Sequence, residues 1–258
     1  MCGIVGLFLK SKNLKPILGE MLTDMLVSMS DRGPDSAGIA IYSEPTQNMV
    51  KITLQSATPT KNFPILVKHL KKVLRTEIKT STIDTHIVIV VSDKEVSNVL
   101  KNIKDLNINL SIMSVGENIE IYKEVGLPKN VASRFNLSKM KGSHGIGHTR
   151  MATESAITTM GAHPFNTGPD QCLVHNGSLS NHNLLRRKLK QNGIAFETEN
   201  DSEVAAAFIT YKMRNGASLE QALKSALYEL DGFYTFVVGT KNGFGVLRDP
   251  IACKPAVM

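Results

Sequence analysis

The sequence contains no tryptophan, few aromatic residues and only three cysteines. Cys2, Cys172 and Cys253 form no Cys-x-x-Cys pair and their number is odd, which argues against a disulfide framework or a zinc cage. We expect Cys172 and Cys253 to be buried thiols, because free cysteine is among the most buried residue types. Cysteine is therefore expected to act here as single side chains rather than as crosslinks.

Long apolar runs are also missing. None approaches the roughly 20 residues that a helix needs to cross a bilayer. The N-terminus has no basic segment followed by a long apolar stretch, and position 2 is not the glycine that N-myristoylation requires. We therefore predict a cytoplasmic protein with no membrane partner.

The charge pattern lacks a concentrated basic tract. The chain of 258 residues is 42% hydrophobic and 21% charged, with a net charge of +7. Short basic groups occur at 68–72 and 186–190, and the second lies on a predicted helix, where a solvated face explains it. Without a recognisable nucleic-acid-binding motif, we predict no nucleic-acid partner. A docking face for an acidic partner subunit remains open.

The hydrophobic pattern predicts an α+β chain. A buried strand is expected over 3–9, followed by a helix over 15–30, and 242–243 reads as the turn of a hairpin near the other end. The predicted helix N-caps in the second half are Ser180, Asp201 or Ser202, and Ser218 in a capping box with Gln221. Strands at both ends with helices between them favour two sheets packed face to face under helical layers.

The middle of the chain has a different texture. Residues 44–140 are rich in Lys and Asn, with strands expected over 86–91 and about 108–115 and a helix over about 93–104. We interpret this stretch as a small α+β insertion without a chemical constellation. The domain is accordingly predicted over 2–258, interrupted by an insertion at about 44–140.

Cys2 is the most informative residue, because it follows the initiator Met1 directly. If Met1 is removed, one residue carries both a thiol and a free α-amine, whose ordinary pKa is about 8. That amine can act as the base for its own thiol, as in N-terminal threonine nucleophiles. The plainer interpretation, a small buried residue that opens a strand, is favoured by Cys2 alone.

Four further motifs change that preference. They are Arg32-Gly33-Pro34-Asp35-Ser36, His148-Thr149-Arg150-Met151-Ala152-Thr153, His175-Asn176-Gly177 and Asn200-Asp201-Ser202-Glu203. In isolation each has an ordinary explanation: a turn, a surface ion pair, a second tight turn or a helix N-cap. The histidines lack the His-Glu-x-x-His pattern of a zinc helix, so we predict no metal site and interpret them as structural or pocket-lining.

Together with Cys2, these motifs resemble the class II glutamine amidotransferases, a branch of the N-terminal nucleophile hydrolases. The resemblance implies a four-layer αββα sandwich. It implies that Cys2 attacks the glutamine amide and forms a γ-glutamyl thioester, with its α-amine moving the proton. It also implies that the Asn176 side-chain amide and the Gly177 backbone N–H form the oxyanion hole.

The resemblance assigns the substrate contacts as well. Arg150 matches the arginine that holds the glutamine α-carboxylate, for which a planar guanidinium is well shaped. Asp201 matches the acid that holds the α-ammonium group. Arg32 matches an arginine that lines the nucleophile site, and Thr153 follows Arg150 at the family spacing and is expected to contact substrate.

The segments around Arg150, Asn176 and Asp201 look most similar to separate amidotransferase subunits of glutamate-synthase-like enzymes, including the N-methylglutamate synthase type. In those enzymes other subunits carry FMN and iron–sulfur clusters, so we expect no cofactor in this chain. The implied activity is hydrolysis of glutamine to glutamate and ammonia, with ammonia delivered to partner synthase subunits of a hetero-oligomer.

Two alternatives remain at this point. A non-catalytic glutamine sensor or scaffold subunit would keep Arg150 and Asp201 but would not need a processed Cys2. Another N-terminal nucleophile amidase would explain Cys2 and leave Arg150 and Asp201 without a role. The end of the chain, Arg248 to Met258, is shorter than the segment expected from related domains, so we also expect either a truncated chain or an end covered by a partner.

Overall fold

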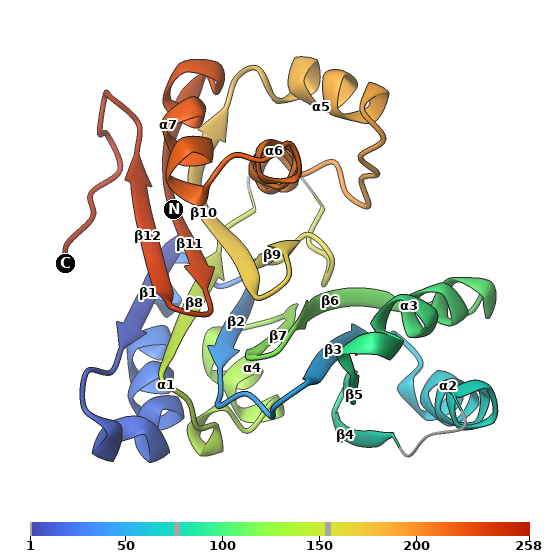
Figure 1. The fold of residues 1–258 in the computed structure, drawn as a ribbon. Helices are drawn as coiled ribbons and strands as arrows, with labels where there is room; N and C mark the ends of the chain where they lie inside the picture. The colour runs from blue at the N-terminus through green and yellow to red at the C-terminus, as the bar shows by residue number, and fades with distance from the viewer. Residues whose placement is uncertain (1, 75–77, 153–155) are drawn as a thin grey trace.

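The computed structural model describes residues 2–74, 78–152 and 156–258. Within these ranges the strands form three four-stranded sheets, all with antiparallel neighbours. Two of the sheets lie against each other with helices on their outer sides, and the third extends from one side of this body (Figure 1).

The first sheet holds the beginning of the chain and has the order β1-β8-β2-β7. Its strands are β1 (Gly3–Phe8), β8 (His144–Arg150), β2 (Ser36–Tyr42) and β7 (Ile119–Val125). The helices beside it are α1 (Leu18–Ser28), α4 (Pro128–Arg134), η1 (Lys12–Ile17), η2 (Ser30–Arg32) and η4 (Leu137–Lys139). α1 packs closely because β8 presents Gly145 and Gly147, where an added Cβ would lie 2.9 Å from Leu22 and Leu26 respectively.

The second sheet has the order β12-β11-β10-β9. Its strands are β12 (Gly243–Arg248), β11 (Gly232–Thr240), β10 (Gln171–Leu179) and β9 (Phe165–Gly168). The helices that cover its outer face are α5 (His182–Gln191), α6 (Asp201–Arg214) and α7 (Leu219–Glu229). β11 and β12 pair from Thr240↔Gly243 onward, which confirms the predicted hairpin but places its turn at 241–242 rather than at 242–243.

The inner faces of these two sheets share one apolar core. Ala40 and Ile146 from the first sheet pack in the same cluster as Cys172, Val174 and Val237 from the second. Burying a valine or isoleucine side chain such as Val174 or Ile146 contributes about 1.5–3 kcal/mol, so the join between the sheets is a major source of stability. The layering helix, sheet, sheet, helix confirms the predicted αββα sandwich.

The third sheet has the order β4-β5-β3-β6 and its own core. Its elements are β3 (Met49–Gln55), α2 (Pro59–Leu74), β4 (Lys79–Ile83), β5 (His86–Ser92), η3 (Asp93–Glu95), α3 (Val96–Asp105) and β6 (Ser111–Gly116). This unit covers 49–116, a narrower span than the insertion expected at about 44–140. β7 and α4 lie within that expected insertion but belong to the first sheet and its helical cover.

Two of the predicted N-caps are wrong. α5 begins at His182 after Asn181, and Ser180 does not precede it directly. α6 is capped by Asn200, whose Oδ1 accepts the backbone N–H of Ser202 at 2.9 Å, rather than by Asp201 or Ser202. The capping box before α7 is confirmed, because Ser218 and Gln221 each accept the backbone N–H of the other.

The two cysteines outside the N-terminus have opposite environments. Cys172 is fully buried between the sheets, as predicted, and burial raises the pKa of its thiol to about 11. Cys253 is exposed, because it lies in the irregular segment that follows β12, so the prediction of a buried thiol is wrong there. Among the described helices, none has the length and apolar character to cross a membrane.

Candidate active site

The pairing of β1 with β8 fixes the position of Cys2. Gly3 lies opposite Thr149, so the residue before the strand reaches the end of β8, and the Cys2 Sγ lies 3.9 Å from the Met151 carbonyl oxygen. The Gly3 N–H donates to Thr149 Oγ1 at 3.2 Å. A Cβ at position 3 would lie 2.7 Å from that oxygen, so glycine is needed for this close pairing. The nucleophile candidate is thus half-buried at a junction of strand ends.

Two side chains from different layers bind the Cys2 carbonyl oxygen. Asn176 Nδ2 on β10 donates to it at 3.2 Å, and Arg32 Nε at the end of η2 donates to it at 3.4 Å. An amide nitrogen carries two hydrogens, so Asn176 has a second N–H besides the one that holds Cys2. The predicted Cys2, Asn176 and Arg32 are therefore in direct contact.

Gly177 follows Asn176 in a conformation that favours glycine. Its φ is +153°, and an added Cβ would overlap the carbonyl oxygen of Phe233 on the neighbouring strand β11. Glycine is therefore required at this position of β10, directly after Asn176. A side-chain amide and a backbone N–H are the donor types that an oxyanion hole uses.

Arg150 ends β8 and is only 4% exposed. Its Nη1 donates to the Ala156 carbonyl oxygen at 3.2 Å. Burial lowers the pKa of its guanidinium, while the nearby Cys2, Asp35 and Asp201 act in the opposite direction. Arg150 therefore faces the same region as Cys2 and Asp201.

Asp35 is a residue whose role the sequence did not reveal. Its backbone N–H donates to the Arg150 carbonyl oxygen at 3.0 Å, and its carboxylate accepts the Ala152 N–H at 2.8 Å. Gly33 makes this contact possible, since a Cβ there would overlap the backbone of Thr149 and Arg150. The Arg32–Ser36 motif thus holds the backbone at Arg150 and Ala152 as well as supplying Arg32. The Gly-Pro-Asp turn residues in this motif were the sequence feature that could have indicated this structural role.

Asp201 opens α6, directly behind the Asn200 cap. Its Oδ2 accepts the Leu179 N–H at 2.9 Å, which ties the start of α6 to the end of β10. A carboxylate in the first turn of a helix is also favoured by the helix dipole. Of the other six predicted site residues, Asn176 and Arg32 contact Cys2, Gly177 follows Asn176, and Arg150 lies near both Cys2 and Asp201. Thr153 lies outside the described residues.

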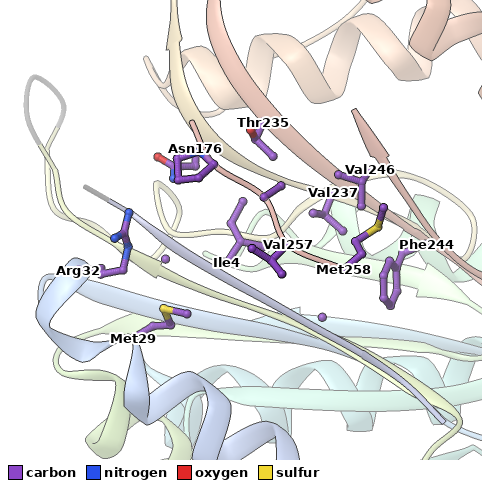
Figure 2. A pocket seen from close by; sticks show the side chains of 14 residues that line it. Ile4, Met29, Arg32, Asn176, Thr235, Val237, Phe244, Val246, Val257 and Met258 are labelled. Atoms are coloured by element: carbon purple, nitrogen blue, oxygen red, sulfur yellow. The ribbon is translucent and has the colours of Figure 1, made fainter. Parts of the chain in front are cut away.

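A cavity of about 460 Å³ adjoins this group. Arg32 and Asn176 lie at one end of it and Phe244 at the other, with Ile4, Val237 and Val246 between them (Figure 2). Neither Arg150 nor Asp201 is among the described residues that line the cavity. The cavity is thus a largely apolar space beside the nucleophile candidate, separate from the two charged groups.

Three buried histidines lie behind the site. The rings of His148 and His163 stack at 4.0 Å between centroids, and His175 immediately precedes Asn176. Burial lowers the pKa of His148 to about 3, that of His175 to about 4, and that of His163 well below its ordinary value. In the described part of the chain, no three His, Cys, Asp or Glu side chains are grouped so that they could hold a metal ion. These imidazoles are neutral core groups.

The buried histidines predict acid sensitivity. Unfolded histidine takes up a proton below about pH 6.5, whereas His86, His148 and His175 stay neutral in the fold until about pH 3 to 4. Their contribution to stability is therefore constant above about pH 6.5 and is lost as the pH falls toward 4. Each contributes a slope of up to about 1.4 kcal/mol per pH unit.

Urea unfolding between about pH 7 and about pH 4.5 checks this expectation. His86 is buried in the third sheet, where its ring contacts the Thr85 hydroxyl. His86→Asn should reduce the slope of the free energy of unfolding against pH by up to about 1.4 kcal/mol per pH unit, the contribution of one histidine. An unchanged slope in that variant would contradict it.

The comparisons with known proteins agree with the geometry. A family model described as a glutamine amidotransferase domain matches residues 148–258. The glutamine amidotransferase-like protein GlxB of Rhizobium meliloti (strain 1021) is 59% identical over 261 residues, covering all of this chain and 85% of that protein. The chain belongs to the class II glutamine amidotransferase family.

Two further similarities cover a smaller part of the matched protein. The glutamine–fructose-6-phosphate aminotransferase of Vibrio vulnificus (strain YJ016) is 32% identical over 133 residues, which are 52% of this chain and 22% of that enzyme. The solved structure of a glutamine phosphoribosylpyrophosphate amidotransferase from B. subtilis matches 99% of this chain and 38% of its own, with a TM-score of 0.57 and 20% identity. That structure supports the fold.

Proposed function

We propose that this chain is a glutaminase subunit, which hydrolyses glutamine through a Cys2 thioester and delivers ammonia to a partner synthase subunit. The observation that carries the proposal is the contact of Asn176 and Arg32 with the Cys2 carbonyl oxygen. This contact holds Cys2 next to the Asn176 side-chain amide, which has a second N–H that can donate to substrate. Membership of a glutamine amidotransferase family supplies the substrate.

The chemistry follows from these positions. The Cys2 Sγ attacks the side-chain amide carbon of glutamine, and the α-amine of Cys2, once Met1 is removed, takes the thiol proton. The second N–H of Asn176 and the backbone N–H of Gly177 stabilise the oxyanion. The amine returns the proton to the leaving nitrogen, which departs as ammonia and leaves a γ-glutamyl thioester. Water then cleaves the thioester, with the amine as base, and releases glutamate.

The charged groups hold the other end of the substrate. In this proposal the Arg150 guanidinium binds the glutamine α-carboxylate, and the Asp201 carboxylate binds the α-ammonium group. Arg32 keeps the Cys2 backbone in place, and Thr153 contacts the substrate. The burial of Arg150 strengthens an ion pair with substrate because less water screens it.

The cavity beside Cys2 supports delivery of ammonia. Apart from Arg32, Asn176 and Thr235, the described side chains that line it are apolar, such as Ile4, Val237 and Phe244, and do not protonate or hydrogen-bond a small neutral base. The proposed acceptor is a glutamate-synthase-like or N-methylglutamate synthase assembly, whose other subunits would carry FMN and iron–sulfur clusters. A cytoplasmic location is part of the same proposal.

The test is alkylation of the untagged protein by 6-diazo-5-oxo-norleucine, followed by intact mass and peptide mapping. We expect loss of Met1 and a single adduct on Cys2. The exposed Cys253 is an internal control for indiscriminate alkylation. Retained Met1 without an adduct would favour the sensor or scaffold subunit, and an adduct only on Cys253 would contradict a glutamine-shaped site.

A further inference from the structure

A buried hydrogen-bond chain connects the strand of Asn176 with the carboxylate of Asp201. The His175 Nδ1 lies 2.8 Å from the Ser202 Oγ, and the Ser202 Oγ lies 3.3 Å from the Asp201 Oδ1. His175 is 2% exposed and Ser202 is 3% exposed. Three side chains from β10 and α6 are thus joined beneath the proposed substrate site.

The proton positions in this series of hydrogen bonds follow from the donors that are available. An ionised carboxylate only accepts, so the contact between Ser202 and Asp201 needs the single hydroxyl hydrogen of Ser202. We therefore assign the neutral Nδ1–H tautomer to His175, in which the ring donates to the Ser202 oxygen and leaves that hydrogen for Asp201. Burial keeps this ring neutral, because it lowers the pKa of His175 to about 4.

A further hydrogen bond ties the same strand to β8. The His148 Nε2 lies 2.9 Å from the His175 carbonyl oxygen, in the peptide group that leads into Asn176. His148 precedes Arg150 by two residues on β8. The strands and the helix that carry Arg150, Asn176 and Asp201 are therefore connected by hydrogen bonds of buried side chains.

We propose that Ser202 and His175 are positioning residues that set the orientation of the Asp201 carboxylate and thereby select for a substrate with an α-amino group. The Leu179 N–H holds Oδ2 and the Ser202 hydroxyl holds Oδ1, so the carboxylate is fixed through both of its oxygens. Without Ser202 the carboxylate keeps one donor and can rotate away from the ammonium group. This proposal rests on the proposed function, because it concerns the same glutamine site.

The experiment compares two reagents with the same reactive group. 6-Diazo-5-oxo-norleucine carries the α-amino group, and 6-diazo-5-oxohexanoate lacks it. The rate constant for alkylation of Cys2 is measured for both with the full chain, and their ratio reports the recognition of the α-amino group alone. Alkylation is irreversible and accumulates, so a weakly bound reagent still gives a measurable rate.

For Ser202→Ala we expect the ratio to fall roughly tenfold, the size typical of one lost hydrogen bond to a charged group, with the rate for 6-diazo-5-oxohexanoate unchanged. Ser202→Thr keeps the hydroxyl and should restore most of the ratio. His175→Asn, which keeps an N–H near the Nδ1 position, should retain more of it than His175→Leu. The thermal midpoint of each variant identifies any that do not fold. The two Ser202 variants and the two His175 variants are independent tests, so one pair still decides the proposal if a variant of the other does not fold.

The outcomes separate the two proposals. An unchanged ratio in Ser202→Ala, or an equal loss of rate for both reagents, would overturn the positioning role while leaving the proposed function in place. A wild-type protein in which neither reagent alkylates Cys2 would overturn both.

Discussion

Replacing Cys2 with alanine is expected to lower glutamine hydrolysis by at least about a thousandfold, the scale of losing a covalent nucleophile. The substitution removes the sulfur but leaves the Cys2 carbonyl oxygen, to which Asn176 and Arg32 donate. Folding should therefore be preserved, and Arg150 and Asp201 should still bind glutamine. The measurements are glutamate release, calorimetric binding of glutamine and the thermal midpoint.

The matched control is Cys253→Ala, which removes an exposed thiol in the segment after β12 and should leave hydrolysis unchanged. A permanent N-terminal tag gives the complementary test, because it blocks the α-amine while the thiol remains. We expect the tagged protein to be as inactive as Cys2→Ala. Full hydrolysis by the tagged protein would contradict the α-amine as the base.

The second large effect is expected for Asn176→Ala, which should lower kcat by roughly 10²–10³ with a smaller change in KM. An oxyanion donor acts mainly in the transition state, so its removal affects the chemical step more than substrate binding. Here the same side chain also holds the Cys2 carbonyl oxygen at 3.2 Å, which adds loss of alignment to loss of charge stabilisation.

Steady-state kinetics of glutamine hydrolysis checks this expectation. Asn181→Ala is a suitable control, because it removes an amide that lies two residues beyond the end of β10 and donates to the Glu229 carbonyl oxygen. A rise in KM with unchanged kcat in Asn176→Ala would assign Asn176 to substrate binding instead.

The sequence singled out residues that the structure brings into contact, but it did not predict their surroundings. Cys2, Asn176 and Arg32 were found from short motifs, because each motif has its own chemical logic. Their contact depends on pairings across the chain, such as β1 with β8 over about 140 residues, which no local pattern encodes. The supporting role of Asp35 was missed for the same reason, since its partners Arg150 and Ala152 are distant in sequence.

The cap of α6 shows why neighbouring residues of similar chemistry are hard to separate. Asn200, Asp201 and Ser202 are all good N-cap residues, and local propensity does not choose among them. The structure uses Asn200 as the cap and leaves Asp201 to accept the Leu179 N–H. A carboxylate that capped the helix itself would be less available to a substrate.

Amino-acid composition did not predict where the unit of the third sheet ends. The Lys- and Asn-rich texture suggested that β7 belonged to an inserted unit, but β7 pairs with β2 in the first sheet. Lys123 on β7 is buried, and its ammonium group donates to the carbonyl oxygens of Met160, Ala162 and Pro164 at 2.8–3.3 Å. A lysine used in this way is indistinguishable from a surface lysine when only the sequence is read.

The two donors on the Cys2 carbonyl oxygen come from opposite halves of the sandwich. Arg32 follows α1 on the side of the first sheet, and Asn176 belongs to the second sheet. The arrangement that we propose for catalysis is therefore completed only when the halves have joined. A newly made chain with one half formed would carry a thiol but no working glutaminase, so glutamine would be spared until assembly of the domain is finished.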